Sequence, residues 1–143
     1  MDIFGIGTDI TSCERIGRMI ERHGDYFLTR VYTDWELEYC RGRKQFRESF
    51  TGRWCAKEAI LKALGTGWIR GIAWRDMEIR ALPTGAPYVL LGGGVLEAAL
   101  LHGVSEIQVS ISHCDTHATA MALALRNGLE FPMEKRFERL DKS

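Results

Sequence analysis

Apolar and polar positions alternate along this chain in a way that divides it into strands and helices separated by turns. Short apolar or alternating runs predict strands at residues 3–10, 77–82, 88–91, 107–112 and 118–125. Spacings of three and four predict helices from Thr11 or Ser12 to about Arg22, from Thr33 or Asp34 through 39, over 49–64 and over 96–102. The fold class we expect is α+β, with a small, mostly antiparallel sheet packed with helices.

The segment over residues 49–64 is the strongest helix prediction, and Gly65 or Gly67 is expected to end it. Nearly every position in it is apolar or small, so this helix should be largely buried. Glu58 and Lys62 lie one turn apart on a narrow face that also holds Cys55. The pair could be an ordinary surface ion pair worth about 0.2–0.5 kcal/mol. Apolar neighbours favour a charged site instead, because an ionised carboxylate is costly in such surroundings.

A second acid, Asp9, ends the first apolar strand. One interpretation is a helix N-cap, a common role for aspartate. The other is a metal ligand, since Mg²⁺ is usually held by one or two carboxylates together with substrate phosphates. The pairing of Asp9 with Glu58 fits that pattern, and an enzyme acting on a phosphate ester is our leading interpretation.

The composition indicates an ordinary globular protein but does not identify its function. The 143 residues are 45% hydrophobic and 27% charged, as in ordinary globular proteins, and nineteen basic residues balance nineteen acidic ones. A balanced charge disfavours nucleic acid and anionic membranes as partners. We expect one domain over residues 1–126 and a charged tail over 127–143.

Localisation is predicted from features of the same kind. We expect neither a signal peptide nor a spanning helix, because no apolar run is long enough. Four cysteines are scattered without paired spacing, which indicates mostly buried thiols in a reduced, cytoplasmic setting.

Two further groups of polar residues, a pair of histidines and a set of arginines, are candidates for binding a ligand or a partner protein. His113 and His117 have the spacing of a zinc pair, but they flank a predicted turn, so a contact from a histidine to phosphate or ribose is favoured over zinc. Three arginines share one side of the first helix: Arg15, Arg18 and Arg22. They form either a solvated face or a surface that docks an acidic helix.

Three motifs in this order resemble one known family. They are Gly5 to Ile10 with Arg15-Ile16, then Gly52 to Ala59 continuing through Lys62 to Gly67, then Ser110 to His113. Together they resemble holo-acyl-carrier-protein synthase, the small type of 4'-phosphopantetheinyl transferase, over residues 3 to about 125. The resemblance implies the 4'-phosphopantetheinyl transferase fold, assembled as a homotrimer with sites between subunits.

The resemblance also implies a reaction. Phosphopantetheine would pass from coenzyme A to a serine of an apo acyl carrier protein, with Mg²⁺ as cofactor and adenosine 3',5'-bisphosphate as the other product. Such a transfer depends mainly on positioning and charge neutralisation. By motif position, Asp9 and Glu58 would hold Mg²⁺, and Lys62 would neutralise a phosphate oxygen.

The remaining roles follow from the same resemblance. Coenzyme A would be bound by a set of five residues: Arg53, Lys57, Gly65, Ser112 and His113. Arg15, with Arg18 and Arg22 as its neighbours, would dock the acidic carrier protein. A metal-bound water, Glu58 and a loop residue all stay open as the base, and the carrier could serve fatty acid or polyketide synthesis.

The chain departs from the family pattern at the start of its main helix, where Trp54 and Cys55 replace the usual Phe and Ala and could reshape the pocket near the nucleotide. The charged tail also extends past the usual end. The alternative function is a catalytically inactive trimeric module that binds coenzyme A or the carrier, although the presence of Asp9, Glu58 and Lys62 argues against it.

Overall fold

The main sheet joins the first strand of the chain to its last two. A computed structural model describes residues 2–126, in which β1 (Asp2–Ser12), β4 (Val104–His113) and β5 (His117–Arg126) form an antiparallel sheet in the order β1-β5-β4. In that register Asp9 lies opposite Ala120 of β5, and Ala120 lies opposite Ile111 of β4. The alternation of apolar and polar residues therefore correctly predicted these strands.

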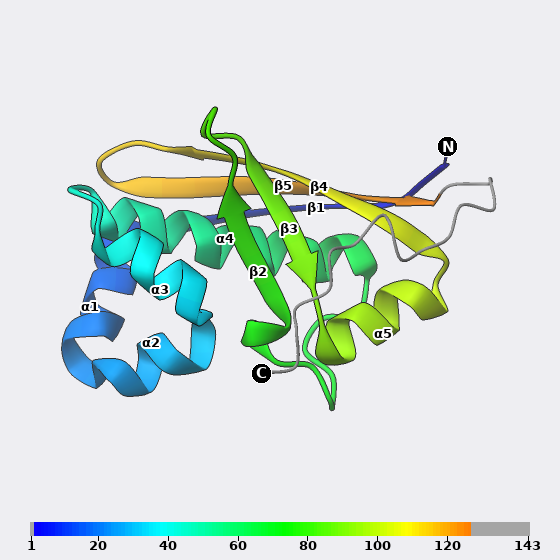
Figure 1. Cartoon of the computed structure of the whole chain (residues 1–143), viewed down its shortest axis with the longest axis horizontal. Coiled ribbons are helices and arrows are strands. Elements are labelled where there is room, and N and C mark those ends of the chain that lie inside the picture. The colour runs from blue at the N-terminus through cyan, green and yellow to red at the C-terminus, as the bar shows by residue number, and fades with distance from the viewer. Residues whose placement is uncertain (1, 127–143) are drawn as a thin grey trace.

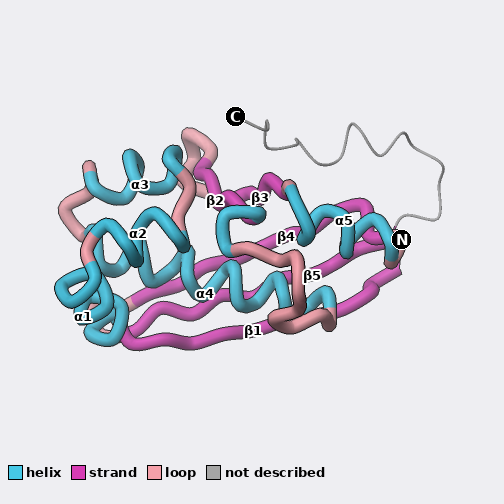
Figure 2. The backbone as a smooth tube through the Cα atoms, turned by 90° about the horizontal axis from the view of Figure 1, so that it is seen from below, coloured by secondary structure: helices cyan, strands magenta, loops and turns pink. Residues whose placement is uncertain are grey.

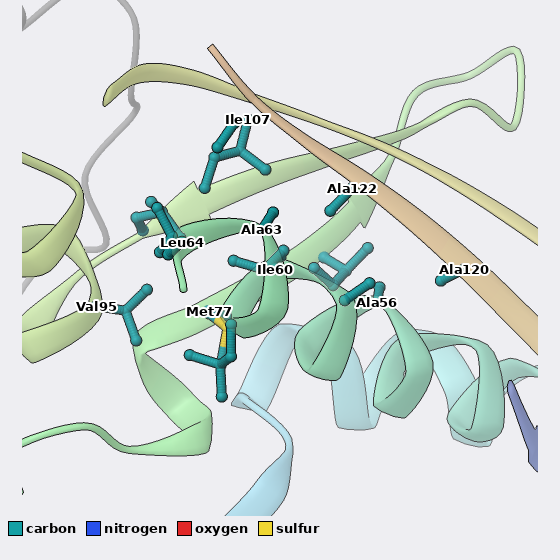
Figure 3. Packing of buried hydrophobic residues seen from close by; sticks show 14 of the residues in the cluster. Ala56, Ile60, Ala63, Leu64, Met77, Val95, Ile107, Ala120 and Ala122 are labelled. Atoms are coloured by element: carbon teal, nitrogen blue, oxygen red, sulfur yellow. The ribbon is translucent and has the colours of Figure 1, made fainter. Parts of the chain in front are cut away.

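One long helix covers the inner face of this sheet. Helix α4 (Phe46–Leu64) runs along β1, β5 and β4 (Figures 1 and 2). Its small residues Ala56 and Ala63 lie in the same buried core cluster as Ala120 and Ala122 of β5 (Figure 3). Alanine on both surfaces lets the helix and the sheet approach closely, which brings β1 and its Asp9 within reach of the α4 side chains.

Two glycines of β1 make the closest approach possible. A Cβ atom on Gly7 would lie 2.0 Å from the carbonyl oxygen of Ala59, and one on Gly5 would lie 1.9 Å from that of Ala63. Neither position can therefore carry a side chain unless the strand and α4 separate. A glycine within a strand often marks such an approach, and here it sets the spacing between the two elements that carry Asp9 and Glu58.

A second, two-stranded sheet crosses α4 obliquely (Figure 1). Strands β2 (Met77–Ala81) and β3 (Pro87–Leu91) form the predicted antiparallel hairpin, preceded by the short 3-10 helix η1 (Trp74–Asp76). Helix α5 (Gly93–Leu101) then leads into β4. Buried residues of the hairpin, Met77, Ile79 and Leu91, join the core beneath α4.

Three short helices gather around the beginning of α4 (Figure 2). They are α1 (Cys13–His23), α2 (Asp25–Val31) and α3 (Asp34–Arg41). Ser12 caps α1 through Arg15 N, and Thr33 forms a capping box with Glu36 at α3. Both caps agree with the predicted starts. A separate core cluster, which includes Ile16, Phe27 and Phe50, packs these helices together.

The differences from prediction lie at element ends and in one missed helix. Helix α2 has only seven residues and follows a glycine directly, so its apolar pattern is too short to be recognised. Helices α4 and α5 each begin three residues earlier than expected. The proposed tail, residues 127–143, lies outside the described residues. Within residues 2–126, no helix has the length and apolarity needed to cross a membrane.

The outer face of the main sheet carries large apolar side chains in contact with solvent. Ile3, Ile6 and Ile10 of β1 are 67%, 61% and 68% exposed, and Met121 of β5 is 40% exposed. Val109 and Ile111 of β4 instead pack against the core. The predicted alternation thus separates a core face from an apolar outer face.

Candidate active site

Asp9 lies on the inner face of β1, against α4. Its side chain is 16% exposed, and its two oxygens have separate partners. Thr11 Oγ1 donates to Oδ2 at 3.0 Å, and Lys62 Nζ approaches Oδ1 at 3.4 Å. The N-cap interpretation is wrong, because Ser12 caps α1 instead. The carboxylate is therefore held at the surface between a strand and a helix, where it can face a ligand.

Glu58 faces the same place from α4. The side chain is half-buried, and burial raises the pKa of its carboxyl. The charge of Asp9 raises this pKa further, while the charges of Lys62 and Arg15 and the nearby indole of Trp68 lower it. The fold thus brings two acids distant in sequence close enough to repel each other, an arrangement that a cation between them would relieve.

Lys62 completes this group. Its ammonium donates to the carbonyl oxygen of Thr8 at 2.9 Å and pairs with Asp9, while its side chain stays 54% exposed. The simple helical ion pair with Glu58 is thus replaced by contacts to β1. Half of the lysine side chain remains accessible, so the ammonium can also meet an anionic ligand.

The donor set fits a magnesium ion that is completed by its substrate. Asp9 and Glu58 offer carboxylate oxygens, which Mg²⁺ prefers, and Mg²⁺ commonly takes only one or two protein carboxylates. Among the described residues, no group of three or more His, Cys, Asp or Glu side chains could form a metal cage.

The end of α4 forms a turn beside these residues. Gly65 adopts a left-handed conformation with φ of 71°, which ends the helix at Leu64, two residues after Lys62. In the loop that follows, Trp68 lies near Glu58. Sequence reasoning missed Trp68, although a large aromatic residue directly after a Gly-Thr-Gly turn is a signal that could have found it.

Lys57, predicted to contact coenzyme A, points into the protein interior. Its side chain is fully buried, and its ammonium donates to Glu36 Oε1 at 2.6 Å and to the carbonyl oxygens of Val31 and Trp74 at 2.6 and 3.3 Å. Burial lowers the pKa of Lys57, and the Glu36 carboxylate opposes that change. The prediction that Lys57 contacts coenzyme A is not supported, because a helical turn of 100° per residue directs it into the interior.

Arg53 and His113 meet in a basic pocket on the other side of α4. This pocket of about 220 Å³ is lined by Tyr39, Arg43, Arg53, Arg80 and His113, among others. Arg53 Nε donates to the carbonyl oxygen of Ile79 at 3.1 Å, and its guanidinium lies 4.5 Å from the ring centroid of Tyr39. These contacts hold Arg53 at a cavity that is lined by three arginines and one acid, Glu48, a balance of charge that suits a phosphate.

The other residues of this pocket were not expected from the sequence. Arg80 comes from β2 and Tyr39 from α3, so only the packing of these elements against α4 assembles them. Ser112 is exposed next to His113 near the end of β4. Within one chain Arg53 and Glu58 project from different sides of α4, about 140° apart, since they are five residues apart.

The arginines of α1 remain on the surface. Arg15, Arg18 and Arg22 are all exposed, and Arg18 pairs with Glu14 one turn earlier. The guanidinium of Arg15 lies 5.9 Å from the ring centroid of Trp54. This helix therefore presents its positive charge directly beside the carboxylate site.

Trp54 and Cys55 have separate surroundings. Trp54 lines an apolar pocket of about 330 Å³ together with Met19, Phe27 and Trp74, so its bulk lies beside α1 rather than in the basic pocket. Cys55 is fully buried under β5, where its thiol contacts the carbonyl oxygen of Ala118 at 3.3 Å. Burial raises the pKa of this thiol to about 12, which keeps it protonated at neutral pH.

A comparison with protein families agrees with this arrangement. The family model described as the 4'-phosphopantetheinyl transferase superfamily matches residues 5–123, which include both carboxylates and the basic pocket. The chain belongs to the 4'-phosphopantetheinyl transferase superfamily. The family resemblance carried by the three sequence motifs is therefore confirmed, and the protein is a transferase.

Relatives of similar length support the same membership. The holo-[acyl-carrier-protein] synthase of Solibacter usitatus is 43% identical over 120 residues, which cover 84% of this chain and 94% of that protein. The protein of the same name from Chlamydia pneumoniae is 43% identical over 125 residues, covering 87% and 99%.

Solved structures of this family share the fold. The holo-[acyl-carrier-protein] synthase of Neisseria meningitidis gives a TM-score of 0.78 at 34% identity, covering 87% of this chain and 100% of that one. The Helicobacter pylori enzyme, solved in complex with coenzyme A, gives 0.74 at 29% identity and covers 84% and 99%. The expected α+β fold is confirmed.

Proposed function

We propose that this protein is a holo-[acyl-carrier-protein] synthase. It would transfer the 4'-phosphopantetheine group of coenzyme A to a serine of an apo acyl carrier protein and release adenosine 3',5'-bisphosphate. The observation that carries this proposal is the convergence of Asp9, Glu58 and Lys62 from β1 and α4. Relatives named for this activity and a family structure that holds coenzyme A support it.

The carboxylates would form the metal side of the site. Asp9 and Glu58 would hold Mg²⁺, which when bound supplies positive charge to the pyrophosphate of coenzyme A. Lys62, fixed by Thr8 and half exposed, would neutralise a phosphate oxygen from the protein side. The turn at Gly65 would allow the substrate to pass close to the backbone at the end of α4.

Helix α1 would receive the carrier protein. Its exposed arginines Arg15, Arg18 and Arg22 suit an acidic partner, because guanidinium groups pair well with carboxylates. The apolar pocket lined by Met19 and Trp54 lies beside this helix and would accept apolar side chains of the same partner. A carrier bound there would have its serine near Glu58, since Arg15 acts electrostatically on that residue.

The complete site would require a second subunit. Arg53, Ser112 and His113 would bind the nucleotide phosphates or ribose of coenzyme A, yet their pocket faces away from the carboxylates of the same chain. The apolar outer face of β1 and β5 offers a surface that a neighbouring copy would bury. A homotrimer in which one subunit's basic pocket meets the next subunit's carboxylates accounts for both features.

Mass spectrometry tests the reaction directly. Apo acyl carrier protein incubated with enzyme, coenzyme A and Mg²⁺ should gain the mass of one phosphopantetheinyl group. Asp9→Asn and Glu58→Gln should abolish this gain while the fold persists, and Glu97→Gln on the exposed part of α5 should not affect it. No gain with wild-type enzyme and retained coenzyme A binding would favour the inactive binding module instead.

Light scattering and subunit mixing test the shared site. A trimer is expected at low micromolar concentration, and a fully active monomer would refute it. Inactive Glu58→Gln subunits mixed with inactive Arg53→Ala subunits should recover activity, because some sites would then combine an intact Glu58 with an intact Arg53. The matched mixture of Glu58→Gln with Asp9→Asn should stay inactive, since both residues lie in one subunit's half of the site.

A further inference from the structure

A buried acid is paired with one arginine of the basic pocket. Glu78 on β2 is only 3% exposed, and each of its carboxylate oxygens accepts a hydrogen bond. Thr33 Oγ1, at the start of α3, donates to Oε1 at 2.5 Å, and Arg80 Nε donates to Oε2 at 2.8 Å. Because residues two apart on a strand share one face, Glu78 and Arg80 both lie on the side of β2 that meets α3.

Two aromatic residues of α3 contact the arginines of the pocket. The guanidinium of Arg80 lies 5.4 Å from the ring centroid of Trp35, which stacks on Tyr39 with centroids 5.0 Å apart. Arg53 is placed in a similar way, over the ring of Tyr39 and with its Nε on the carbonyl oxygen of Ile79. Two arginines, one from β2 and one from α4, thus line one pocket with each Nε bound to a group of β2.

A contact through Nε suits a guanidinium that also has to bind an anion. An arginine has five N–H donors and only one of them is on Nε, so the contact with Glu78 leaves the four donors of the terminal nitrogens for other partners. The side chain of Arg80 is 32% exposed and lines the pocket, whereas the side chain of Glu78 is 5% exposed. The carboxylate is therefore shielded from a ligand, while the guanidinium is accessible to one.

We infer that Glu78 is a positioning residue, which holds Arg80 at the basic pocket so that its terminal N–H groups bind a phosphate of coenzyme A. This inference rests on the proposed function, specifically on its binding of coenzyme A. Placing a long side chain in advance removes the loss of side-chain freedom that binding would otherwise cost. Stability alone does not explain the buried acid, because a buried ion pair commonly stabilises a fold no better than apolar residues of similar volume.

A purely electrostatic role for Glu78 predicts the opposite result. An acid beside an arginine reduces the attraction of the pocket for a phosphate, so its removal would tighten binding. Under the positioning role, removal of the acid frees Arg80 to move and weakens binding instead. The hydrogen bond from Thr33 fixes Glu78, and Glu78 together with the ring of Trp35 fixes the arginine. The direction of the change in affinity therefore separates the two roles.

Isothermal titration calorimetry with coenzyme A, at fixed Mg²⁺, measures this role without turnover. Arg80→Gln should raise the dissociation constant of coenzyme A by about 10- to 100-fold, since hydrogen bonds to a charged group are lost. Glu78→Gln should raise it by roughly two- to tenfold, because the arginine remains but is no longer held in place. In transfer assays both variants should raise KM for coenzyme A and leave KM for the carrier protein near that of wild type.

A double-variant cycle separates positioning from general structure. In the Arg80→Gln background, Glu78→Gln should cause no further loss of affinity for coenzyme A, because the residue that it positions is already absent. A further loss by the same factor would mean that Glu78 acts on the fold rather than through Arg80, and it overturns the inference. Arg75→Gln and Asp34→Asn are the matched controls, since they break an exposed pair outside the pocket and should leave coenzyme A binding unchanged.

Glu78→Asp provides the reading if Glu78→Gln does not fold. It keeps the negative charge but shortens the side chain by one methylene group, so it should weaken coenzyme A binding by displacing Arg80 alone. Circular dichroism and light scattering check that each variant keeps the fold and assembly of wild type. Unchanged or tighter binding of coenzyme A by a folded Glu78 variant overturns the inference, and so does an unchanged dissociation constant for Arg80→Gln.

Two comparisons distinguish this inference from the function beneath it. Dephospho-coenzyme A lacks the 3'-phosphate, so a loss confined to coenzyme A assigns that phosphate to Arg80, whereas an equal loss with both ligands assigns the pyrophosphate; either result supports the inference. Wild-type enzyme that binds coenzyme A but transfers nothing overturns the proposed reaction alone, because the binding test of Glu78 still applies. Wild-type enzyme that neither binds coenzyme A nor transfers overturns both.

Discussion

Breaking the buried ion pair between Lys57 and Glu36 by removing one partner should strongly destabilise the fold. Both side chains are fully buried, and their contacts join α4 to four other elements. Lys57 reaches the end of α2 and the 3-10 helix η1 through the carbonyl oxygens of Val31 and Trp74. Glu36 accepts hydrogen bonds from the backbone N–H groups of Thr33 in the capping box and Ile79 in β2, each at 2.9 Å.

The expected cost of breaking this pair follows from its burial. Lys57→Met would leave the Glu36 carboxylate in the interior without its cation, which typically costs about 3–5 kcal/mol. With a urea m-value of about 2 kcal/mol/M, the unfolding midpoint should fall by roughly 1.5–2.5 M. Glu36→Gln in the same chain removes the orphaned charge, so the double variant should be more stable than the sum of the single losses by about 0.5–3 kcal/mol.

Urea unfolding followed by circular dichroism, at one protein concentration for all variants, measures these changes. Arg41→Met is the matched control, because it removes a cation from an exposed pair with Asp25 and should cost less than about 1 kcal/mol. A midpoint shift for Lys57→Met no larger than that of Arg41→Met would refute the reasoning.

Three other predictions concern packing, docking and thiol chemistry. Gly7→Ala should destabilise the fold by about 3 kcal/mol or more in urea unfolding, because its Cβ would lie 2.0 Å from the carbonyl oxygen of Ala59. Gly42→Ala is the control and should be tolerated, because its Cβ would meet no atom closer than 3.5 Å. Arg15→Glu should raise KM for the carrier about tenfold with little change for coenzyme A, and equal changes in steady-state assays would place Arg15 in the metal site instead. Cys114 is exposed, and a hydrogen bond from Thr116 lowers the pKa of its thiol. Its thiolate should therefore form at lower pH than that of an ordinary cysteine. Native protein should show one fast thiol with Ellman's reagent, with a rate midpoint at lower pH than that of free cysteine, and more than one fast thiol would contradict the burial of the other three.

Much of the fold could be predicted because its signals are local. Alternation identified the strands of both sheets, and Ser12 and Thr33 identified helix starts through their own hydrogen bonds. Gly65 was correctly predicted to end α4, because glycine adopts positive φ more readily than other residues do. Helix α2 was missed since seven residues give too little periodicity.

The two acids of the candidate site were predicted from the sequence, because an ionised carboxylate in an apolar element is costly unless a partner stabilises it. Asp9 and Glu58 met this condition, and the motif order supplied their family. The burial of the Lys57 side chain could not be predicted in this way. It precedes Glu58 by one residue, and only the direction in which α4 packs against α3 and β2 decides that one side chain is buried and the other faces Asp9.

The amino-acid sequence by itself determined where the strands and helices lie, which residues could carry chemistry, and which family the chain belongs to. The tertiary structure decided which of those residues meet. It turned Lys57 inward to Glu36, placed Trp68 near Glu58, and left Arg53 and Glu58 on different sides of α4. The physical reason is that periodicity depends on neighbours within one turn or strand, whereas contacts between residues far apart depend on how closely whole elements pack.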